Sequence, residues 1–335
     1  MNKPIYMDHA ATTPLDPRVL EKMTPYLTDV YGNANSQHAF GRAADRGVDE
    51  ARDTIASLIG AKPSEIYFTS GGTEADNWAL KGIMAAQTKK KHLVVSAIEH
   101  AAMLERAKQL SKAGYEVSCA PVDEFGRVDL DALRALVRED TALVGVMAAN
   151  NEVGTIQPVG EIAAIAHAKG ALMFTDAVQA AGVLELDVRA LGVDLMSASA
   201  HKIYGPKGVG MLYVRNGVKI ENLIAGGHQE RTRRGGTTNV PGVVGFAEAF
   251  RLAAENREAN NAYVTALRDR LIDRVQAEVP DVKLNGHRTL RLPANADFSF
   301  RYIEGESVLF SLDLAGIAVS SGSACSSGSL EPSHV

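Results

Sequence analysis

One cysteine, Cys325, stands where a thiol could act as a nucleophile. It lies in Ser-Ser-Gly-Ser-Ala-Cys-Ser-Ser-Gly-Ser, residues 320–329, whose side chains have almost no bulk. Such a segment cannot pack into a core, so it predicts a flexible loop that faces solvent. The second cysteine, Cys119, follows Tyr-Glu-Val-Ser in a predicted strand, where we expect a small buried hydrophobic residue. A disulfide between such a strand and a flexible loop is not expected in the cytosol, so Cys325 is interpreted as a free thiol.

A second kind of chemistry is indicated by Gly71, Gly72 and Thr73, which follow a predicted strand and begin a predicted helix. Two glycines let the backbone approach a ligand closely. A helix N-terminus offers free N–H groups to an anion such as phosphate, and the Thr73 hydroxyl would be an added donor. An ordinary tight turn between a strand and a helix is the alternative.

Two charged residues follow further apolar strands. Asp176, in Phe-Thr-Asp-Ala-Val-Gln, needs a partner if it is partly buried. A protonated ring nitrogen would serve, although an N-cap role is more common for Asp after a strand. Lys202, in Ser-Ala-His-Lys-Ile-Tyr-Gly-Pro, could form an imine with an aldehyde, although solvated loop lysines are more common. A phosphate cradle, a carboxylate for a pyridinium nitrogen and an imine-forming lysine are together the requirements of pyridoxal phosphate.

Alternating strands and helices must position these residues. Apolar runs of strand length are Ile66–Ser70, His92–Ala97, Ala142–Asn150, Ala171–Ala177, Leu195–Ala200 and Val209–Val214. Helix-period segments are Val48–Ile59, Glu74–Ala86, Leu130–Val137 and Val159–Lys169, the last with Gly170 as its C-terminal cap. The alternation predicts an α/β fold with a mostly parallel sheet, helices on both faces, and the ligand beyond the carboxyl ends of the strands.

The pattern changes towards the end of the chain. Residues 247–277 form a long, charged segment that we expect to be helical and to lead into a smaller α+β domain. We predict a large domain of residues 15–250. The small domain would combine residues 1–14 with residues 251–335 and carry the cysteine loop.

Composition excludes several classes of function. The chain has 335 residues, of which 46% are hydrophobic and 22% charged, as is usual for a globular protein. Its net charge of −5 gives no reason to expect nucleic-acid binding. We find neither an apolar run long enough for a bilayer nor a signal peptide, so we expect a cytoplasmic protein without a membrane partner. No CxxC pattern or Cys/His cluster indicates a metal site.

Four motifs carry a resemblance to a known family: Thr-Ser-Gly-Gly-Thr-Glu-Ala-Asp-Asn, Asn-Asn-Glu-Val-Gly, Ser-Ala-His-Lys-Ile-Tyr-Gly-Pro-Lys-Gly and Ser-Ser-Gly-Ser-Ala-Cys. From Tyr6 to His334 the chain resembles the cysteine desulfurases of the NifS/IscS group, which are fold-type I, class V aminotransferase-like enzymes. The resemblance implies removal of sulfur from L-cysteine, giving L-alanine and a persulfide on Cys325. The sulfur would pass to iron–sulfur scaffold proteins or to thiolation acceptors. A selenocysteine lyase, another enzyme of this fold and a non-catalytic scaffold are the alternatives, and the loop thiol disfavours an ordinary aminotransferase.

The same resemblance implies a role for individual residues. Lys202 should carry the cofactor and act as a base with help from His100, which stacks on the ring. Asp176 should bind the pyridinium nitrogen and Gln179 the phenolic oxygen. The phosphate should be held by Gly72, Thr73, Ser199 and His201. Further positions are Asn151 near the ring, Asn33 near the substrate carboxylate, and Thr237 at the phosphate of a neighbouring subunit, which implies a homodimer.

The family pattern also extends past the last residue of this sequence. We therefore expect the sequence to be a partial one, with the arginine that clamps the substrate carboxylate lying beyond position 335. Bidentate recognition of a carboxylate by arginine is not readily replaced, so we expect the chain as given to bind pyridoxal phosphate poorly or to turn over weakly, although its cofactor residues are present.

Overall fold

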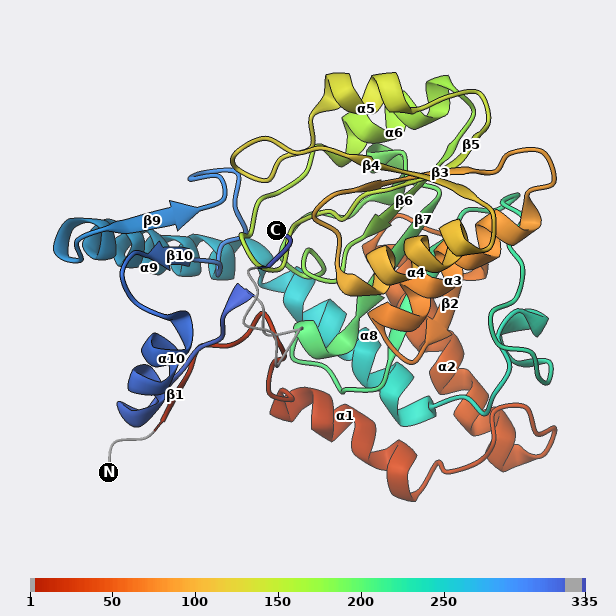
Figure 1. Ribbon diagram of the computed structural model, residues 1–335. Helices are drawn as coiled ribbons and strands as arrows, with labels where there is room; N and C mark the ends of the chain where they lie inside the picture. Colours follow the sequence, from red (N-terminus) through yellow and green to blue (C-terminus); the bar gives the residue numbers. More distant parts are fainter. Residues whose placement is uncertain (1–3, 323–332) are drawn as a thin grey trace.

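The structure of the protein, a computed structural model, describes residues 4–322 and 333–335 (Figure 1). Its centre is a seven-stranded sheet. In spatial order the strands are β2 (Ile66–Thr69), β8 (Gly210–Val214), β7 (Leu195–Ser199), β6 (Leu172–Asp176), β5 (Thr141–Gly145), β3 (His92–Ser96) and β4 (Glu116–Ala120). Strand β8 runs antiparallel to β2 and β7, and the other neighbouring pairs are parallel. The predicted mostly parallel sheet is confirmed.

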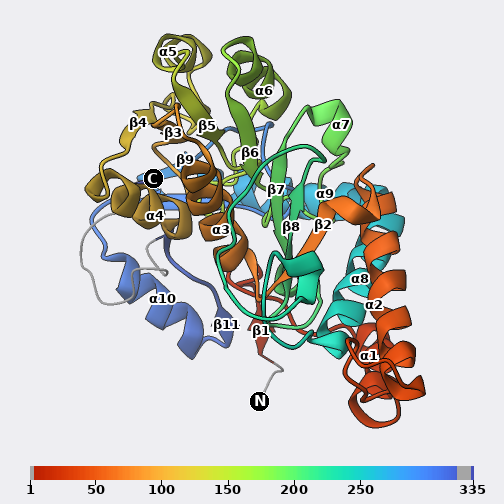
Figure 2. The same cartoon turned by 90° about the vertical axis from the view of Figure 1, so that its right-hand side faces the viewer.

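Helices cover both faces of this sheet (Figure 2). The core on one face is formed with α2 (Ala39–Leu58), α5 (Leu130–Leu136), α6 (Val159–Ala168), α7 (Val188–Leu191) and α8 (Val240–Glu255), and α1 (Pro17–Thr28) joins it. The core on the other face is formed with α3 (Gly72–Ala86) and α4 (Ala101–Lys112), around the fully buried Trp78. Every residue of β2, β3, β5, β7 and β8 is buried, as expected of strands packed on both faces.

Two small sheets lie outside the main one. Strand β1 (Ile5–Tyr6) pairs in parallel with β11 (Ile317–Ala318), so a segment near the start of the chain lies beside one more than 300 residues later. Strand β9 (Val282–Asn285) pairs antiparallel with β10 (Asp297–Phe300). Helices α9 (Arg257–Glu278) and α10 (Gly305–Leu314) accompany them. The domain boundaries at residues 14 and 250 stay a prediction.

Three local predictions need correction. The expected single helix over 247–277 is two helices, because Asn256 ends α8 and its side-chain amide donates to the Leu252 carbonyl (3.0 Å). Strand β5 stops at Gly145, before the predicted end at residue 150. Cys119 is exposed rather than buried, because β4 is an edge strand with β3 as its one neighbour. Gly170 has the positive φ of 64° that a helix C-terminal glycine requires, as predicted.

The opposite edge strand, β2, is covered by η3 (Gln229–Thr232). The Phe68 N–H donates to Glu230 (2.9 Å), and Arg52 donates to both oxygens of Glu230 (2.9 and 2.8 Å). Arg52 also donates to the Ile66 carbonyl (2.6 Å). Because these bonds occupy backbone groups that a sheet edge would otherwise expose, this edge is closed to further strand pairing.

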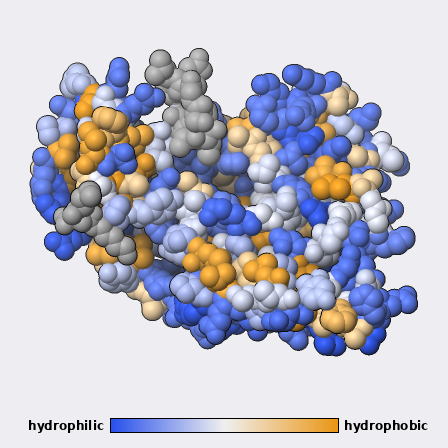
Figure 3. Space-filling view, turned by 90° about the horizontal axis from the view of Figure 1, so that it is seen from below, coloured by the Kyte–Doolittle hydropathy of each residue, from blue (hydrophilic) through white to orange (hydrophobic). Residues whose placement is uncertain are grey.

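The lower face of the molecule carries several separate apolar patches among polar residues (Figure 3). Part of the exposed apolar surface belongs to α10, which has no buried residue and leaves Phe310 65% and Leu314 74% exposed. Within residues 4–322, no helix combines the length and the apolar character needed to cross a membrane.

Candidate active site

A hollow of about 400 Å³ opens at the carboxyl ends of the parallel strands β2 and β7. It is lined by Thr12, residues 70–74, Ser199, His201, Lys207 and Gly208. Parallel strands end at the same edge of a sheet, so residues far apart in sequence meet there. The four predicted phosphate-binding positions, Gly72, Thr73, Ser199 and His201, all line this hollow.

The first turn of α3 forms one wall of the hollow. Gly71 is its N-cap, with φ 153°, and no side chain caps it. A Cβ on Gly72 would lie 2.6 Å from Val178 Cγ2, so glycine is required for this close packing. An α-helix begins with N–H groups that lack a partner inside the helix and carries a partial positive charge there. The wall is therefore suited to an anion.

The acidic residue Glu74 lies in the same turn of α3, but it does not prevent an anion from binding there. Glu74 accepts two bonds from Arg234 (2.8 and 3.0 Å) and one from the Ser70 N–H (2.8 Å). Burial alone would raise the pKa of Glu74, but the bonds from Arg234 and Ser70 hold it below its ordinary value. The Glu74 carboxylate is thus paired with a cation.

Asp176 closes β6 at this edge and is 6% exposed. Its Oδ1 accepts from the Val178 N–H (2.8 Å). Burial raises the pKa of Asp176, while the Val178 N–H and the nearby His100 and Lys202 oppose the rise. A cation next to Asp176 would offset the remaining free-energy cost of burying this carboxylate.

Lys202 and Gln179 both reach the segment that precedes α1. Lys202 lies in η2 (Ala200–Lys202), directly after β7, and its Nζ donates to the carbonyls of Ala10 and Ala11. Gln179 Nε2 donates to the same Ala10 carbonyl (3.0 Å). The segment is held in turn by Thr13, whose N–H and hydroxyl both donate to the His201 carbonyl (2.9 Å each).

Two histidines at the site are neutral near pH 7. His100 is the N-cap of α4, and its Nδ1 accepts from the Ala102 N–H (3.1 Å). Burial lowers the pKa of His100, with Asp176 opposing and Lys202 and His334 adding to the effect. Because Nδ1 accepts, the neutral ring carries its proton on Nε2. Burial, with Lys202 and Lys207, lowers the pKa of His201 to about 4.

The remaining predicted positions are distributed differently. Asn151 lies half-buried in the turn after β5. Asn33 is on the exposed loop between α1 and α2, where its side chain accepts from the Asn35 N–H (3.0 Å), and Thr237 is exposed before α8. Neither of these two lines the hollow, and His100, Asn151, Asp176, Gln179 and Lys202 are not among its lining residues either. Cys325 lies outside the described residues.

Several site residues were not assigned a role from the sequence. The carbonyls of Ala10 and Ala11 are backbone groups, so no residue type marked them. Glu99 is fully buried beside His100, and it accepts from the Ser96 hydroxyl and the Met147 N–H. Its position directly before a predicted site histidine was the one available signal. Its carbonyl accepts from His334 Nε2 (3.0 Å), which brings the last described residues to the site.

Burial raises the pKa of Glu99 to about 8 against the bonds from Ser96 and Met147, with Asp176 adding to the rise. Since the folded pKa lies above the ordinary value of 4.5, neutral Glu99 contributes stability that is complete below pH 4.5 and is lost as the pH rises to about 8. Glu99→Gln should therefore gain stability relative to wild type across this range, by up to about 1.4 kcal/mol per pH unit. Urea unfolding of both proteins from pH 5 to 8 measures this difference.

The exposed Glu278→Gln is the matched control. Arg274 lowers the pKa of Glu278 below 4.5, so the stability that Glu278 contributes changes only below about pH 4.5, and the difference between this variant and wild type should stay constant from pH 5 to 8. A constant difference between Glu99→Gln and wild type from pH 5 to 8 would mean that Glu99 is ionised in the folded protein.

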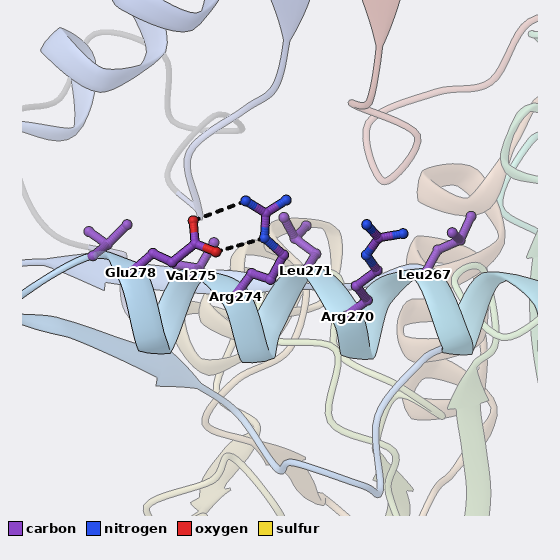
Figure 4. Close-up of a pocket in the computed structure, with 7 residues that line it drawn as sticks. Leu267, Arg270, Leu271, Arg274, Val275 and Glu278 are labelled. Atoms are coloured by element: carbon purple, nitrogen blue, oxygen red, sulfur yellow. Dashed lines mark hydrogen bonds and ion pairs between the residues drawn. The ribbon is translucent and has the colours of Figure 1, made fainter.

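A second hollow of about 410 Å³ runs along the outer side of α9 (Figure 4). Its apolar part is formed by Leu267, Leu271, Val275 and Val279, and its charged part includes the Arg274–Glu278 pair (2.8 Å). All of the described residues that line this groove belong to α9 or to its C-cap, Val279.

Comparison with known proteins gives a consistent result. The aminotransferase class-V family matches residues 5–335. The chain is 51% identical over 336 residues to cysteine desulfurase IscS of Dictyoglomus turgidum, covering 100% of this chain and 85% of that protein. A solved NifS-like protein is 42% identical with a TM-score of 0.92, covering 95% of this chain and 87% of its own. The structure of SspA in complex with cysteine is 31% identical with a TM-score of 0.84, covering 98% and 92%.

Proposed function

This chain belongs to the aminotransferase class-V family, and from that premise we propose that it is a cysteine desulfurase that uses pyridoxal phosphate. It takes sulfur from L-cysteine and releases L-alanine. The observation that carries the proposal is the convergence of Asp176, Lys202 and the uncapped N-terminus of α3 at one edge of the sheet. The 51% identity to a cysteine desulfurase over the whole chain supports it.

The residues present fit pyridoxal phosphate. The first turn of α3, with Ser199 and His201 opposite it, would hold the phosphate. Asp176 would face the pyridine nitrogen and Lys202 the aldehyde. Gln179 would reach the phenolic oxygen, and His100 and Asn151 would lie at the ring. When bound, the cofactor supplies an aldehyde that bonds to amines and a ring that withdraws electrons from the neighbouring carbon.

Three side chains of the protein, those of Asp176, Lys202 and His100, would hold or transfer the protons of the reaction. The Asp176 anion would stabilise a proton on the ring nitrogen. The carbonyls of Ala10 and Ala11 fix the resting place of Lys202 Nζ, the amine that takes the α-proton of the substrate. His100, neutral with its proton on Nε2, can donate that proton.

Sulfur transfer needs a thiolate in addition. In this step an S–S bond forms to the thiolate while the C–S bond of the substrate breaks, and the carbon gains a proton to give alanine. Cys119 is unsuitable because β4, on which it lies, is separated from β7 by three strands, or roughly 19 Å. Cys325 is the remaining thiol, and a persulfide on it is the product that we propose.

The proposal includes partners. Sulfur would leave Cys325 for an iron–sulfur scaffold or another acceptor protein. Thr237, which does not line the hollow of its own chain, would reach the phosphate of a second copy in a homodimer, and Asn33 would lie near the substrate carboxylate. The two-domain division and the cytoplasmic location stay predictions from the sequence.

Product analysis tests the function. Purified protein is incubated with pyridoxal phosphate, L-cysteine and a thiol reductant, and the products are quantified. Equal amounts of L-alanine and sulfide are expected. Pyruvate and ammonia in place of alanine, or amino-group exchange with an added keto acid, would contradict the proposal.

A further inference from the structure

Three buried polar side chains form a row that begins at Asp176, the residue proposed to face the cofactor ring, and continues through Ser197 to Asp76. Ser197 of β7 is the ladder partner of Asp176 of β6, and it lies 2.6 Å (Oγ to Oδ1) from Asp76 of α3, to which it is hydrogen bonded. Ser197 is 0% and Asp76 1% exposed. The Ser197 hydroxyl also lowers the pKa of Asp176, so it lies near that carboxyl, and Asp76 is a second acid on the other side of this hydroxyl.

We propose that Asp76 is a positioning residue that acts through Ser197. Asp76 is held as a neutral carboxylic acid that donates to Ser197 Oγ, and Ser197 then donates to Asp176. This chain of donors keeps Asp176 an anion aimed at the ring nitrogen. The inference rests on the proposed function, because it assigns the row to the same cofactor site.

Hydrogen-bond accounting supports this assignment. A serine hydroxyl has one hydrogen to donate, so it cannot donate to two carboxylates at once. If both acids were ionised, one of two neighbouring buried anions would lose that donor, at a high cost in free energy. A single proton in the row removes this conflict.

The surroundings decide which acid holds the proton. Asp176 has the Val178 N–H and the cationic Lys202 nearby. No Lys, Arg or His of residues 4–322 and 333–335 forms an ion pair with Asp76. Burial raises the pKa of Asp76 well above its usual range, and the carboxyls of Asp176 and Glu99 raise it further against the bond from Ser197. The proton therefore belongs on Asp76.

Comparing Asp76→Asn with Asp76→Ala tests whether Asp76 is neutral or charged in the folded protein. Asparagine has the same shape and can donate from Nδ2 to Ser197, but it never carries a charge. Alanine removes the donor. Binding of pyridoxal phosphate, measured by equilibrium dialysis, should be within about threefold of wild type for Asp76→Asn. It should be about 10- to 100-fold weaker for Asp76→Ala and for Ser197→Ala, which loses the same donor.

Infrared spectra of the cofactor-free protein provide a readout that does not depend on the cofactor. Near pH 6, wild type should have a carboxylic-acid C=O band that Asp76→Asn removes, and Glu99→Gln identifies the contribution of the other buried neutral acid. Loss of a carboxylate band instead, with Asp76→Asn binding as weakly as Asp76→Ala, would overturn the inference. Unchanged binding in Asp76→Ala and Ser197→Ala would also overturn it. Wild type that binds no pyridoxal phosphate would instead sink the proposed function, while the infrared result would still report the charge of Asp76.

Discussion

Lys202→Ala protein should carry no covalently attached cofactor after incubation with pyridoxal phosphate and borohydride, whereas wild type should carry one at Lys202. The reason is that Lys202 Nζ is fixed at the strand ends by the carbonyls of Ala10 and Ala11 and lies near Asp176. Alanine formation should fall by about three orders of magnitude or more, since the variant also loses the proposed base. Mass spectrometry of the peptide that contains residue 202 measures the attachment.

Lys207→Ala is the matched control, because Lys207 lines the hollow at this edge of the sheet but follows the turn after η2. This variant should keep the covalent attachment at Lys202. A reduced adduct at Lys207 in wild type, or an undiminished visible absorbance band in Lys202→Ala, would contradict the assignment of Lys202.

Cys325→Ala should separate cofactor chemistry from sulfur transfer. The variant should bind pyridoxal phosphate with the wild-type absorbance spectrum, because the contacts proposed for the cofactor come from the sheet edge and from the residues around Ala10 and Ala11. It should form no persulfide, and its rate of alanine formation should fall by about two orders of magnitude or more, since the attacking thiolate is gone. Alkylation of cysteine-treated protein followed by mass spectrometry locates the persulfide.

Cys119→Ala is the control for the second thiol. Cys119 is exposed on the edge strand β4, and its loss should change neither the persulfide nor the rate. A persulfide found on Cys119 in wild type, or full activity of Cys325→Ala, would contradict the role proposed for the loop thiol.

The parts of the site that follow a strand directly could be predicted from short stretches of sequence. Gly71-Gly72-Thr73 after β2 and Asp176 at the end of β6 are local features, because a strand, its turn and the first residues of a helix are neighbours in the chain. The same holds for Lys202 after β7. The apolar runs likewise determined which strands are buried on both faces, and hence the mostly parallel sheet.

Tertiary structure alone decided how these pieces meet. The exposure of Cys119 depended on strand order, and the carbonyls that hold Lys202 come from Ala10 and Ala11, about 190 residues earlier in the chain. The row from Asp76 through Ser197 to Asp176 joins three separate elements. A sequence reports which groups can ionise. Whether an acid is buried next to another acid, and so stays neutral, depends on desolvation and on charges across space, which arise only when the chain is folded.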